Sequence, residues 1–189
     1  SVYLNENLSS VAGCTQGKCV SDKTLRNADL MVVIGGDGSI IGFARRFGSL
    51  GVPLLGINLG NLGFLADIAP ENITSTLTDI VYGKFKRDKR FFLEASINSK
   101  KESYIALNEI VIHSGAVAQL IEYEVYIDEA FVYRQRADGL IINSPTGSTA
   151  YSLSGGGPII HPDVKAITLL PMFPHSLNTS PLVFKDTSN

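Results

Sequence analysis

The sequence contains no tryptophan, only two cysteines and no long apolar run. Two cysteines are too few for a disulfide framework or a structural zinc site, and the Cys14–Cys19 spacing is not the redox C-x-x-C pattern. We therefore expect two reduced thiols in a cytoplasmic protein. No apolar stretch approaches the roughly 18 residues of a membrane helix, and residues 1–10 lack a secretory signal pattern, so we expect no membrane partner.

Charge of neither sign dominates, because 16 Lys and Arg stand against 18 Asp and Glu in 189 residues. A dedicated nucleic-acid-binding protein usually has a basic excess, so we expect no nucleic-acid partner. With 18% charged and 44% hydrophobic residues, the chain is also unlike an intrinsically disordered one. Its length suits one full domain or two small ones, with a core large enough to fold without disulfide bonds.

The first part of the chain alternates apolar strands with helices. Residues 30–34 and 53–57 are short continuous apolar runs, typical of strands buried on both faces. Helical spacing follows at residues 39–47, and Pro70 opens a second helix. This order predicts an α/β domain with a parallel sheet over residues 1–86.

The second part of the chain has a different character, which begins after the basic stretch 84–90. Runs with strand composition follow, at residues 91–98, 104–113, 120–131 and 139–143. The run 120–131 alternates apolar and polar residues, so we expect one buried face and one solvated face. These runs predict a mostly β, antiparallel domain over residues 87–189, joined to the first by a linker.

The segment Gly35-Gly36-Asp37-Gly38-Ser39 lies between a strand and a helix. Its glycines let the backbone approach a ligand, and the amides at a helix N-terminus favour phosphate. A carboxylate there suits a base that takes the proton of an attacking hydroxyl, or a Mg²⁺ ligand. The alternative is that Asp37 or Ser39 only caps the helix. The Walker A and G-x-G-x-x-G motifs are absent, which disfavours those two classes of nucleotide-binding protein.

Residues 138–158 combine an apolar strand, a turn of small residues, a short helical stretch and the triple glycine 155–157. Tyr151 could stack on a base, and the turn offers free amides. Hydroxyl groups come from Thr146, Ser148, Thr149 and Ser154. A ligand site is predicted, and the alternative is a glycine-rich connection with solvated hydroxyls. No G-x-S-x-G motif indicates a hydrolase.

Polar residues also interrupt two strand patterns. Asn108-Glu109 lies within the apolar run 104–113, where burial is costly unless a ligand pairs with both side chains. The alternative places Glu109 on a solvated face. Arg134, Arg136 and Asp138 alternate, so a strand would present them on one face, either around a ligand phosphate or in surface ion pairs. The histidines lack metal-ligand spacing, so we expect no metal site formed by the protein alone.

These motifs together resemble the NAD kinase family in its bacterial form. They are G-G-D-G-S at 35–39, G-N-L-G-F-L at 60–65, N-E at 108–109, R-x-D-G at 136–139, T-G-S-T-A-Y-S-L-S at 146–154 and G-G-P at 156–158. Their order and spacing match over nearly the whole chain. G-G-D-G alone also occurs in lipid kinases of the diacylglycerol type and in phosphofructokinases, whereas T-G-S-T-A-Y-S-L-S combined with N-E is specific.

The resemblance implies that the γ-phosphoryl group of ATP passes to the 2′-hydroxyl of the adenosine ribose of NAD, with Mg²⁺ or another divalent metal. Asp37 would be the general base. The phosphate loop would comprise Gly35, Gly36, Gly38 and Ser39. The residues expected to contact NAD are Asp37, Gly38, Phe64, Asn108, Glu109, Gln119, Arg136, Asp138, Thr149, Ala150, Tyr151, Ser152, Leu153 and Ser154. Gln119 stands where several relatives carry a basic residue.

The family fold is an α/β N-terminal domain followed by an all-β C-terminal domain, with ligands in the cleft between them. Members are usually homodimers or homotetramers. They normally carry a strand and a helix before the segment at residues 2–4 and continue past Asn189, so we expect this chain to be truncated at both ends. Ser180 stands where relatives commonly have Arg. Two rivals remain: a lipid kinase, against which the polar loop 149–154 argues, and a dinucleotide-binding module without catalysis.

Overall fold

The computed structural model describes residues 3–5, 18–20, 22–60, 63–98, 102–115, 119–176 and 179–189, with side chains from residue 24 onward. The chain divides into two compact units, Ser1–Lys86 and Arg87–Asn189. Cys14 lies outside the described residues, and only the backbone of Cys19 is described. Among the described residues, no helix has both the length and the apolar composition needed to cross a membrane.

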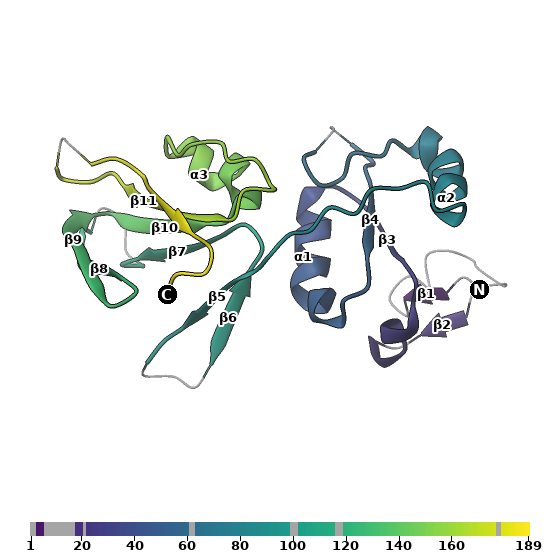
Figure 1. Ribbon diagram of the computed structural model, residues 1–189, viewed down its shortest axis with the longest axis horizontal. Helices are drawn as coiled ribbons and strands as arrows, with labels where there is room; N and C mark the ends of the chain where they lie inside the picture. The colour runs from purple at the N-terminus through teal and green to yellow at the C-terminus, as the bar shows by residue number, and fades with distance from the viewer. Residues whose placement is uncertain are drawn as a thin grey trace. The chain divides into compact units, whose positions relative to one another are not determined.

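The first unit is built from parallel strand pairs and helices (Figure 1). Strands β3 (Met31–Ile34) and β4 (Leu54–Ile57) pair in parallel, and α1 (Asp37–Phe47) connects them. The remaining elements are β1 (Tyr3–Asn5), β2 (Lys18–Val20), the 3₁₀ turns η2 (Asp22–Asn27), η3 (Gly48–Leu50) and η4 (Pro70–Asn72), and α2 (Ile73–Val81). Strands β1 and β2 are also parallel. The prediction of an α/β unit with parallel strands is confirmed.

Helix α1 covers one face of this strand pair because its apolar residues recur at helical spacing. Ile40, Ala44 and Phe47 are buried, and Ile40 joins Val33 in the small core of the unit. The expectation that residues 30–34 are buried on both faces is wrong for the described part of the chain. Met31 and Val33 are buried, whereas the alternate residues Val32 and Ile34 are 43% and 59% exposed.

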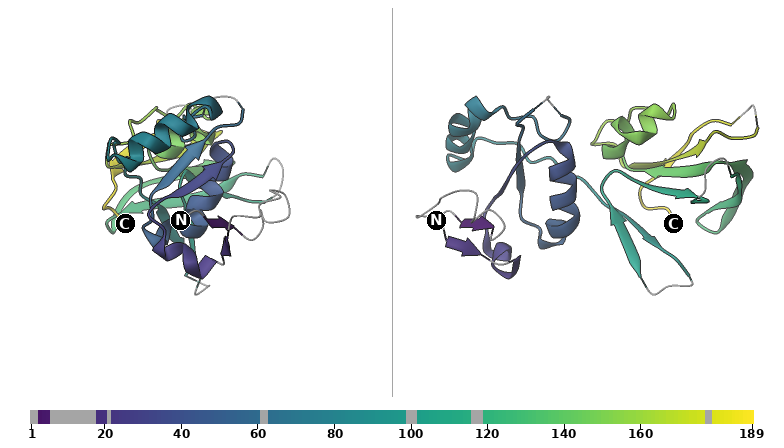
Figure 2. Two further views of the ribbon diagram at one scale, coloured as in Figure 1. Left: turned by 90° about the vertical axis from the view of Figure 1, so that its right-hand side faces the viewer. Right: turned by 180° about the vertical axis from the view of Figure 1, so that it is seen from behind.

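The second unit is antiparallel throughout. Its strands are β5 (Leu93–Ser96), β6 (Ser103–Ala106), β7 (Glu109–His113), β8 (Ile121–Ile127), β9 (Ala130–Ala137), β10 (Gly139–Asn143), β11 (Ala166–Met172) and β12 (Leu182–Lys185). A four-stranded sheet has the order β12-β11-β10-β7, and the pairs β5–β6 and β8–β9 form separate two-stranded sheets. Figure 2 shows the β5–β6 pair, in teal, as a two-stranded ribbon. The predicted antiparallel β unit is confirmed.

Two predicted strands are each divided into two in the structure. The run 104–113 breaks after Ala106, so that β6 and β7 belong to different sheets. The break occurs because the backbone carbonyl groups of Leu107 and Asn108 accept hydrogen bonds from Ser144 instead of from a strand. The run 120–131 reverses direction at residues 128–129, whose positive φ angles of 50° and 69° form a tight hairpin turn.

Strand β10 lies inside the four-stranded sheet, and its side chains alternate between two buried faces. Leu140 packs in a cluster with Val125 and Leu169. Ile141 faces the opposite side, where a Cβ atom added to Gly155 would lie 3.8 Å from the Ile141 Cδ1 atom. The short helical segments η5 (Thr146–Thr149) and α3 (Tyr151–Ser154) follow β10 directly.

We expect Ile141→Ala to lower the free energy of unfolding of the second unit by about 2–5 kcal/mol, because it leaves a cavity under α3. Ile141 is 1% exposed, whereas Ile112 on the neighbouring strand β7 is 49% exposed. Ile112→Ala is therefore the matched control and should cost less than about 1 kcal/mol. Denaturant unfolding of both variants measures the difference, and equal losses would contradict this assignment of the core.

Candidate functional site

The glycine-rich loop between β3 and α1 holds the ends of β3 and β4 together. The Gly35 amide donates to the Ile57 carbonyl oxygen at 2.8 Å. Gly35 has a φ of 154°, and a Cβ atom there would lie 2.4 Å from the Ser39 Oγ atom, so only glycine fits. Gly36 is the N-cap of α1, and no side chain caps the helix. The alternative that Asp37 or Ser39 serves as the helix cap is therefore wrong.

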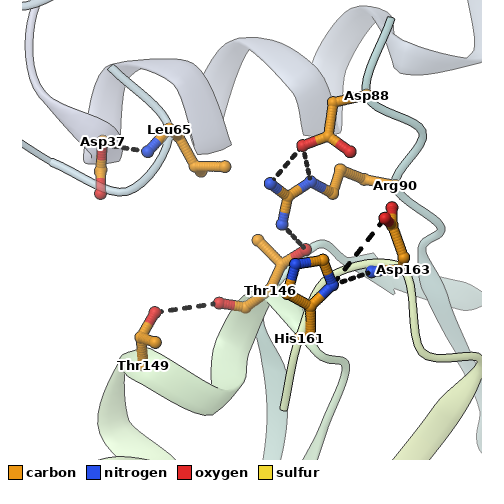
Figure 3. A network of polar contacts seen from close by, with 8 residues as sticks. All are labelled: Asp37, Leu65, Asp88, Arg90, Thr146, Thr149, His161 and Asp163. Atoms are coloured by element: carbon orange, nitrogen blue, oxygen red, sulfur yellow. Dashed lines mark hydrogen bonds and ion pairs between the residues drawn. The ribbon is translucent and has the colours of Figure 1, made fainter. Parts of the chain in front are cut away.

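The Asp37 carboxylate instead accepts hydrogen bonds from three consecutive backbone amides of the second glycine-rich loop. The Phe64 amide donates to Oδ2 at 2.8 Å, and the amides of Leu65 and Ala66 donate to Oδ1 at 3.0 and 2.9 Å. Figure 3 shows the contact with Leu65. A carboxylate offers about four acceptor positions. One position, on Oδ2, therefore remains for another donor.

The close approach of this loop requires glycine at position 63. A Cβ atom there would lie 2.1 Å from the Asp37 Oδ1 atom and 2.5 Å from its Cγ atom. The loop also carries Phe64, whose side chain is 72% exposed. Asn61 and Leu62, in the same predicted motif, lie outside the described residues.

Asn58 closes the same loop from its other side, a role that none of the sequence motifs indicated. Its buried side chain donates through Nδ2 to the Ala66 carbonyl oxygen at 3.2 Å and accepts from the Gly60 amide at 2.8 Å. The sequence feature that could have identified Asn58 is its position as a polar residue directly after the strand β4. Asn58 and Asp37 thus fix the loop together.

The environment of Asp37 lowers its pKa. Burial by itself raises the pKa of this carboxyl group, but hydrogen bonds from the amides of Ala66, Phe64 and Leu65 stabilise the ionised form and outweigh it. The pKa therefore lies below the ordinary value of 3.8. Asp37 is ionised at neutral pH and can accept a hydrogen bond, but it is intrinsically a weak base.

In the second unit, the N-E motif and the turn after β10 lie against each other. The Ser144 amide donates to the Asn108 carbonyl oxygen at 2.9 Å, and the Ser144 hydroxyl donates to the Leu107 carbonyl oxygen at 2.5 Å. A Cβ atom on Gly147 would lie 2.2 Å from the Asn108 carbonyl oxygen. Glycine at 147 therefore permits this contact, which brings two predicted motifs together.

Two serine side chains of the turn are buried. Ser148 is fully buried, donates to the Pro145 carbonyl oxygen at 2.6 Å and accepts from the Ile160 amide at 3.0 Å. Ser152 is also fully buried, and a Cβ atom on Gly157 would lie 2.2 Å from its hydroxyl oxygen. The alternative of solvated hydroxyls is thus wrong for Ser148.

The predicted ligand residues of the segment 149–154 differ in exposure. Thr149 and Ala150 are partly buried, and the Thr149 hydroxyl donates to the Thr146 carbonyl oxygen at 3.5 Å. Tyr151, Leu153 and Ser154 are exposed, so their side chains are available to a ligand. The side chain of Ser152 points into the unit instead.

Asn108 and Glu109 are both partly buried. The Asn108 Oδ1 and Glu109 Oε2 atoms are buried and have no hydrogen-bond partner among the described residues. Burial raises the pKa of the Glu109 carboxyl group. Glu109 therefore does not lie on a fully solvated face, as one alternative expected, and its carboxyl group lacks a donor that a ligand or water could supply.

The predicted cluster Arg134, Arg136 and Asp138 does not form one strand face. Arg134 is exposed and pairs with Glu124 across the β8–β9 hairpin, as expected for a surface ion pair. Arg136 is also exposed, whereas Asp138 follows Ala137, the last residue of β9. The strand ends too early to align all three. Gln119 is exposed and precedes β8.

Arg90 places a positive charge beside the turn after β10. The sequence pattern had assigned this residue only to a linker. Its Nε atom donates to the Asp88 carboxylate at 3.0 Å, and its Nη1 atom donates to the Thr146 hydroxyl at 3.4 Å (Figure 3). Within the described part of the chain, no group of three or more His, Cys, Asp or Glu side chains could hold a metal ion.

Comparison with known proteins gives consistent matches to both units. The model of the ATP-NAD kinase N-terminal domain matches residues 15–85, and that of the ATP-NAD kinase C-terminal domain matches residues 107–189. The NAD kinases of Salmonella enteritidis PT4 and Salmonella typhimurium LT2 are 52% identical over 166 residues, which cover 86% of this chain and 57% of each relative. The chain thus spans little more than half the length of these relatives.

Two solved structures are similar to the chain. The yeast NADH kinase complexed with NADH has a TM-score of 0.82 and 34% sequence identity, covering 90% of this chain and 52% of that one. The NAD kinase from Archaeoglobus fulgidus in complex with ATP has a TM-score of 0.74 and 31% identity, covering 88% of this chain and 65% of that one.

We expect Gly63→Ala to displace the Asp37 carboxylate and release the amides of residues 64–66. The lost hydrogen bonds should destabilise the first unit by about 1–3 kcal/mol. Gly42→Ala is the matched control, because an added Cβ atom in the middle of α1 meets nothing within 4 Å. It should stabilise α1 by about 0.5–1 kcal/mol. Amide hydrogen exchange at 64–66 is the readout, and unchanged protection in Gly63→Ala would contradict the proposed anchoring.

The lowered pKa of Asp37 also predicts the pH dependence of stability. Because the folded pKa lies below the unfolded value, the stabilisation is complete above about pH 4 and is lost as the pH falls through the folded pKa. The difference in melting temperature between wild type and Asp37→Asn should therefore shrink in acid. Asp79→Asn, which replaces an exposed carboxylate on α2, is the control for the loss of one acidic group. A difference that grows in acid would exclude the amide-bound carboxylate.

Proposed function

The chain belongs to the NAD kinase family, and we propose that the complete protein transfers the γ-phosphoryl group of ATP to the 2′-hydroxyl of the adenosine ribose of NAD, giving NADP. The 52% identity to the Salmonella NAD kinases supports this activity. So do the similar structures named as complexes with NADH and with ATP. The observation that carries the proposal is the ionised Asp37 at the start of α1, with one acceptor position left on Oδ2.

In this reaction Asp37 acts as the general base. The 2′-oxygen of the ribose forms the new bond to the γ-phosphorus, the bond between that phosphorus and the bridging oxygen breaks, and ADP leaves. The hydroxyl proton passes to the free position on Asp37 Oδ2. A weak base is compatible with this step, because the attacking oxygen forms little bond in a loose phosphoryl-transfer transition state and its proton can leave late.

The loop of Gly35, Gly36, Gly38 and Ser39 is the proposed phosphate site. Gly36, Gly38 and Ser39 are exposed at the start of an eleven-residue helix, where backbone amides and the helix dipole favour an anion. Mg²⁺ commonly binds through one or two carboxylates together with substrate phosphates. The general-base role uses the one free acceptor position of Asp37, so the substrate phosphates and water would supply the ligands of the ion. The ion, when bound, neutralises charge on the phosphates.

The proposed dinucleotide contacts come mainly from the second unit. The unpaired Oδ1 acceptor of Asn108 and the carboxylate of Glu109 suit the amino group of adenine and the hydroxyl groups of ribose. Tyr151 is 47% exposed and available for stacking on a base. We keep as further contacts Gly38, Phe64, Gln119, Arg136, Asp138, Thr149, Ala150, Leu153, Ser154 and, through its backbone, Ser152.

The family resemblance also leads us to propose a cytoplasmic homodimer or homotetramer. Light scattering on the complete protein would give the number of subunits directly.

The proposed role of Asp37 predicts a large loss of turnover in Asp37→Asn. With Mg²⁺, ATP and NAD, NADP formation by the complete protein should fall roughly 10²- to 10⁴-fold, the range of general-base catalysis. The affinity for NAD, measured by calorimetry, should change much less. Asp79→Asn on α2 is the matched control and should keep wild-type turnover.

Three other results would change the assignment. Equal turnover in wild type and Asp37→Asn would support the kinase activity but would show that Asp37 is not the general base. A loss of NAD affinity in Asp37→Asn as large as the loss of turnover would assign Asp37 to loop anchoring, because a general base acts on turnover and not on binding. No NADP from a folded complete protein would reject the kinase activity and leave the lipid-kinase or binding-module alternatives.

A further inference from the structure

Three polar side chains form a row across the four-stranded sheet of the second unit. Asn143, the last residue of β10, lies directly opposite Glu109 on β7 and Thr168 on β11. Residues directly opposite each other in an antiparallel sheet project to the same face, with Cβ atoms roughly 4.5–5.5 Å apart. The three side chains are therefore neighbours on one face.

Each member of the row has an oxygen atom without a partner. Asn143 and Thr168 are fully buried. The Glu109 Oε2, Asn143 Oδ1 and Thr168 Oγ1 atoms are all buried and make no hydrogen bond to any described residue. Buried polar atoms in folded proteins are nearly always paired, with protein groups or with ordered water. Three such atoms in one row therefore indicate a shared partner.

The donors and acceptors in the row identify the chemistry of that partner. The Asn143 Nδ2 atom donates to the Ser144 carbonyl oxygen at 3.0 Å, so Oδ1 is the atom of this side chain that lacks a partner. Oδ1 of Asn143 and Oε2 of an ionised Glu109 can only accept, whereas the Thr168 hydroxyl can donate. The row thus needs a small partner that donates twice and accepts once.

We propose that Glu109, Asn143 and Thr168 hold one internal water molecule, through which Asn143 and Thr168 act as positioning residues for the Glu109 carboxylate. The water accepts the Thr168 hydroxyl proton and donates to Asn143 Oδ1 and Glu109 Oε2. It thereby makes three hydrogen bonds, the usual number for a buried water. Oε1 of Glu109 is then left for the ligand, a step that rests on the proposed function.

Two features of the chain support a positioning role. Glu109 is the first residue of β7, directly after the break at Asn108. Its backbone is restrained by one neighbouring strand, β10, because β7 lies at the edge of the sheet. Ser144 and Gly147 tie that break to the turn after β10. A water bound to both Asn143 and Thr168 would restrain the carboxylate end of Glu109 as well.

Thr168→Val tests the proposal, because valine has nearly the same shape and lacks the hydroxyl group. In a high-resolution crystal structure of the complete wild-type protein, we expect an ordered water within hydrogen-bond distance of all three oxygens. Thr168→Val should lose it. The KM for NAD should rise about 3- to 10-fold, as for one lost hydrogen bond, with kcat nearly unchanged. Thr168→Ser restores the hydroxyl and should recover both the water and the KM.

Thr78→Val is the matched control for removing a threonine hydroxyl, since that group only bonds to the Thr74 carbonyl oxygen within α2. It should leave the KM unchanged. The proposal is overturned if wild-type density shows no water between the three oxygens, or if Thr168→Val keeps the wild-type KM. The wild-type crystal structure shows whether the water is present even if Thr168→Val fails to fold. This measurement does not depend on turnover, so failure of the kinase assignment is distinguishable from failure of the water site.

Discussion

Hydrogen bonds from the amides of residues 64–66 to the Asp37 carboxylate determine the local structure of the first unit. They hold one glycine-rich loop against the start of the helix that follows the other. They require glycine at position 63, keep the carboxylate ionised and leave Phe64 at the surface. Because a single side chain has all these effects, replacing it changes loop order and acceptor chemistry together. A loss of turnover in an Asp37 variant must therefore be distinguished from a loss of order in the loop at residues 64–66.

In the second unit, backbone contacts hold two segments that are distant in sequence against each other. Asn108 and the turn after β10 approach so closely that only glycine fits at position 147, and Ser144 satisfies the two carbonyl groups exposed where β6 ends. The break therefore leaves Asn108 outside both strands and makes Glu109 the first residue of β7.

Local patterns were enough to predict β3, α1, β4, β10 and the antiparallel character of the second unit, because each depends on residues close in sequence. They could not predict the division of the run 104–113, since it depends on bonds to Ser144, 36 residues beyond Asn108. The partner of Asp37 was missed for the same reason. The row of Glu109, Asn143 and Thr168 becomes visible only when the strand register is known.

The environments of the two motif carboxylates have opposite effects on their pKa values. Three amide donors lower the pKa of Asp37, whereas burial without a donor raises that of Glu109. Environments that separate the pKa values of two acids commonly separate their roles. Within the proposed function, an ionised Asp37 suits acceptance of a proton beside charged phosphates. In the same proposal, hydroxyl or amino donors of a bound nucleoside reach Oε1 of Glu109, while the internal water donates to the buried Oε2. Binding would therefore stabilise the ionised form of Glu109 and oppose the effect of burial on its pKa.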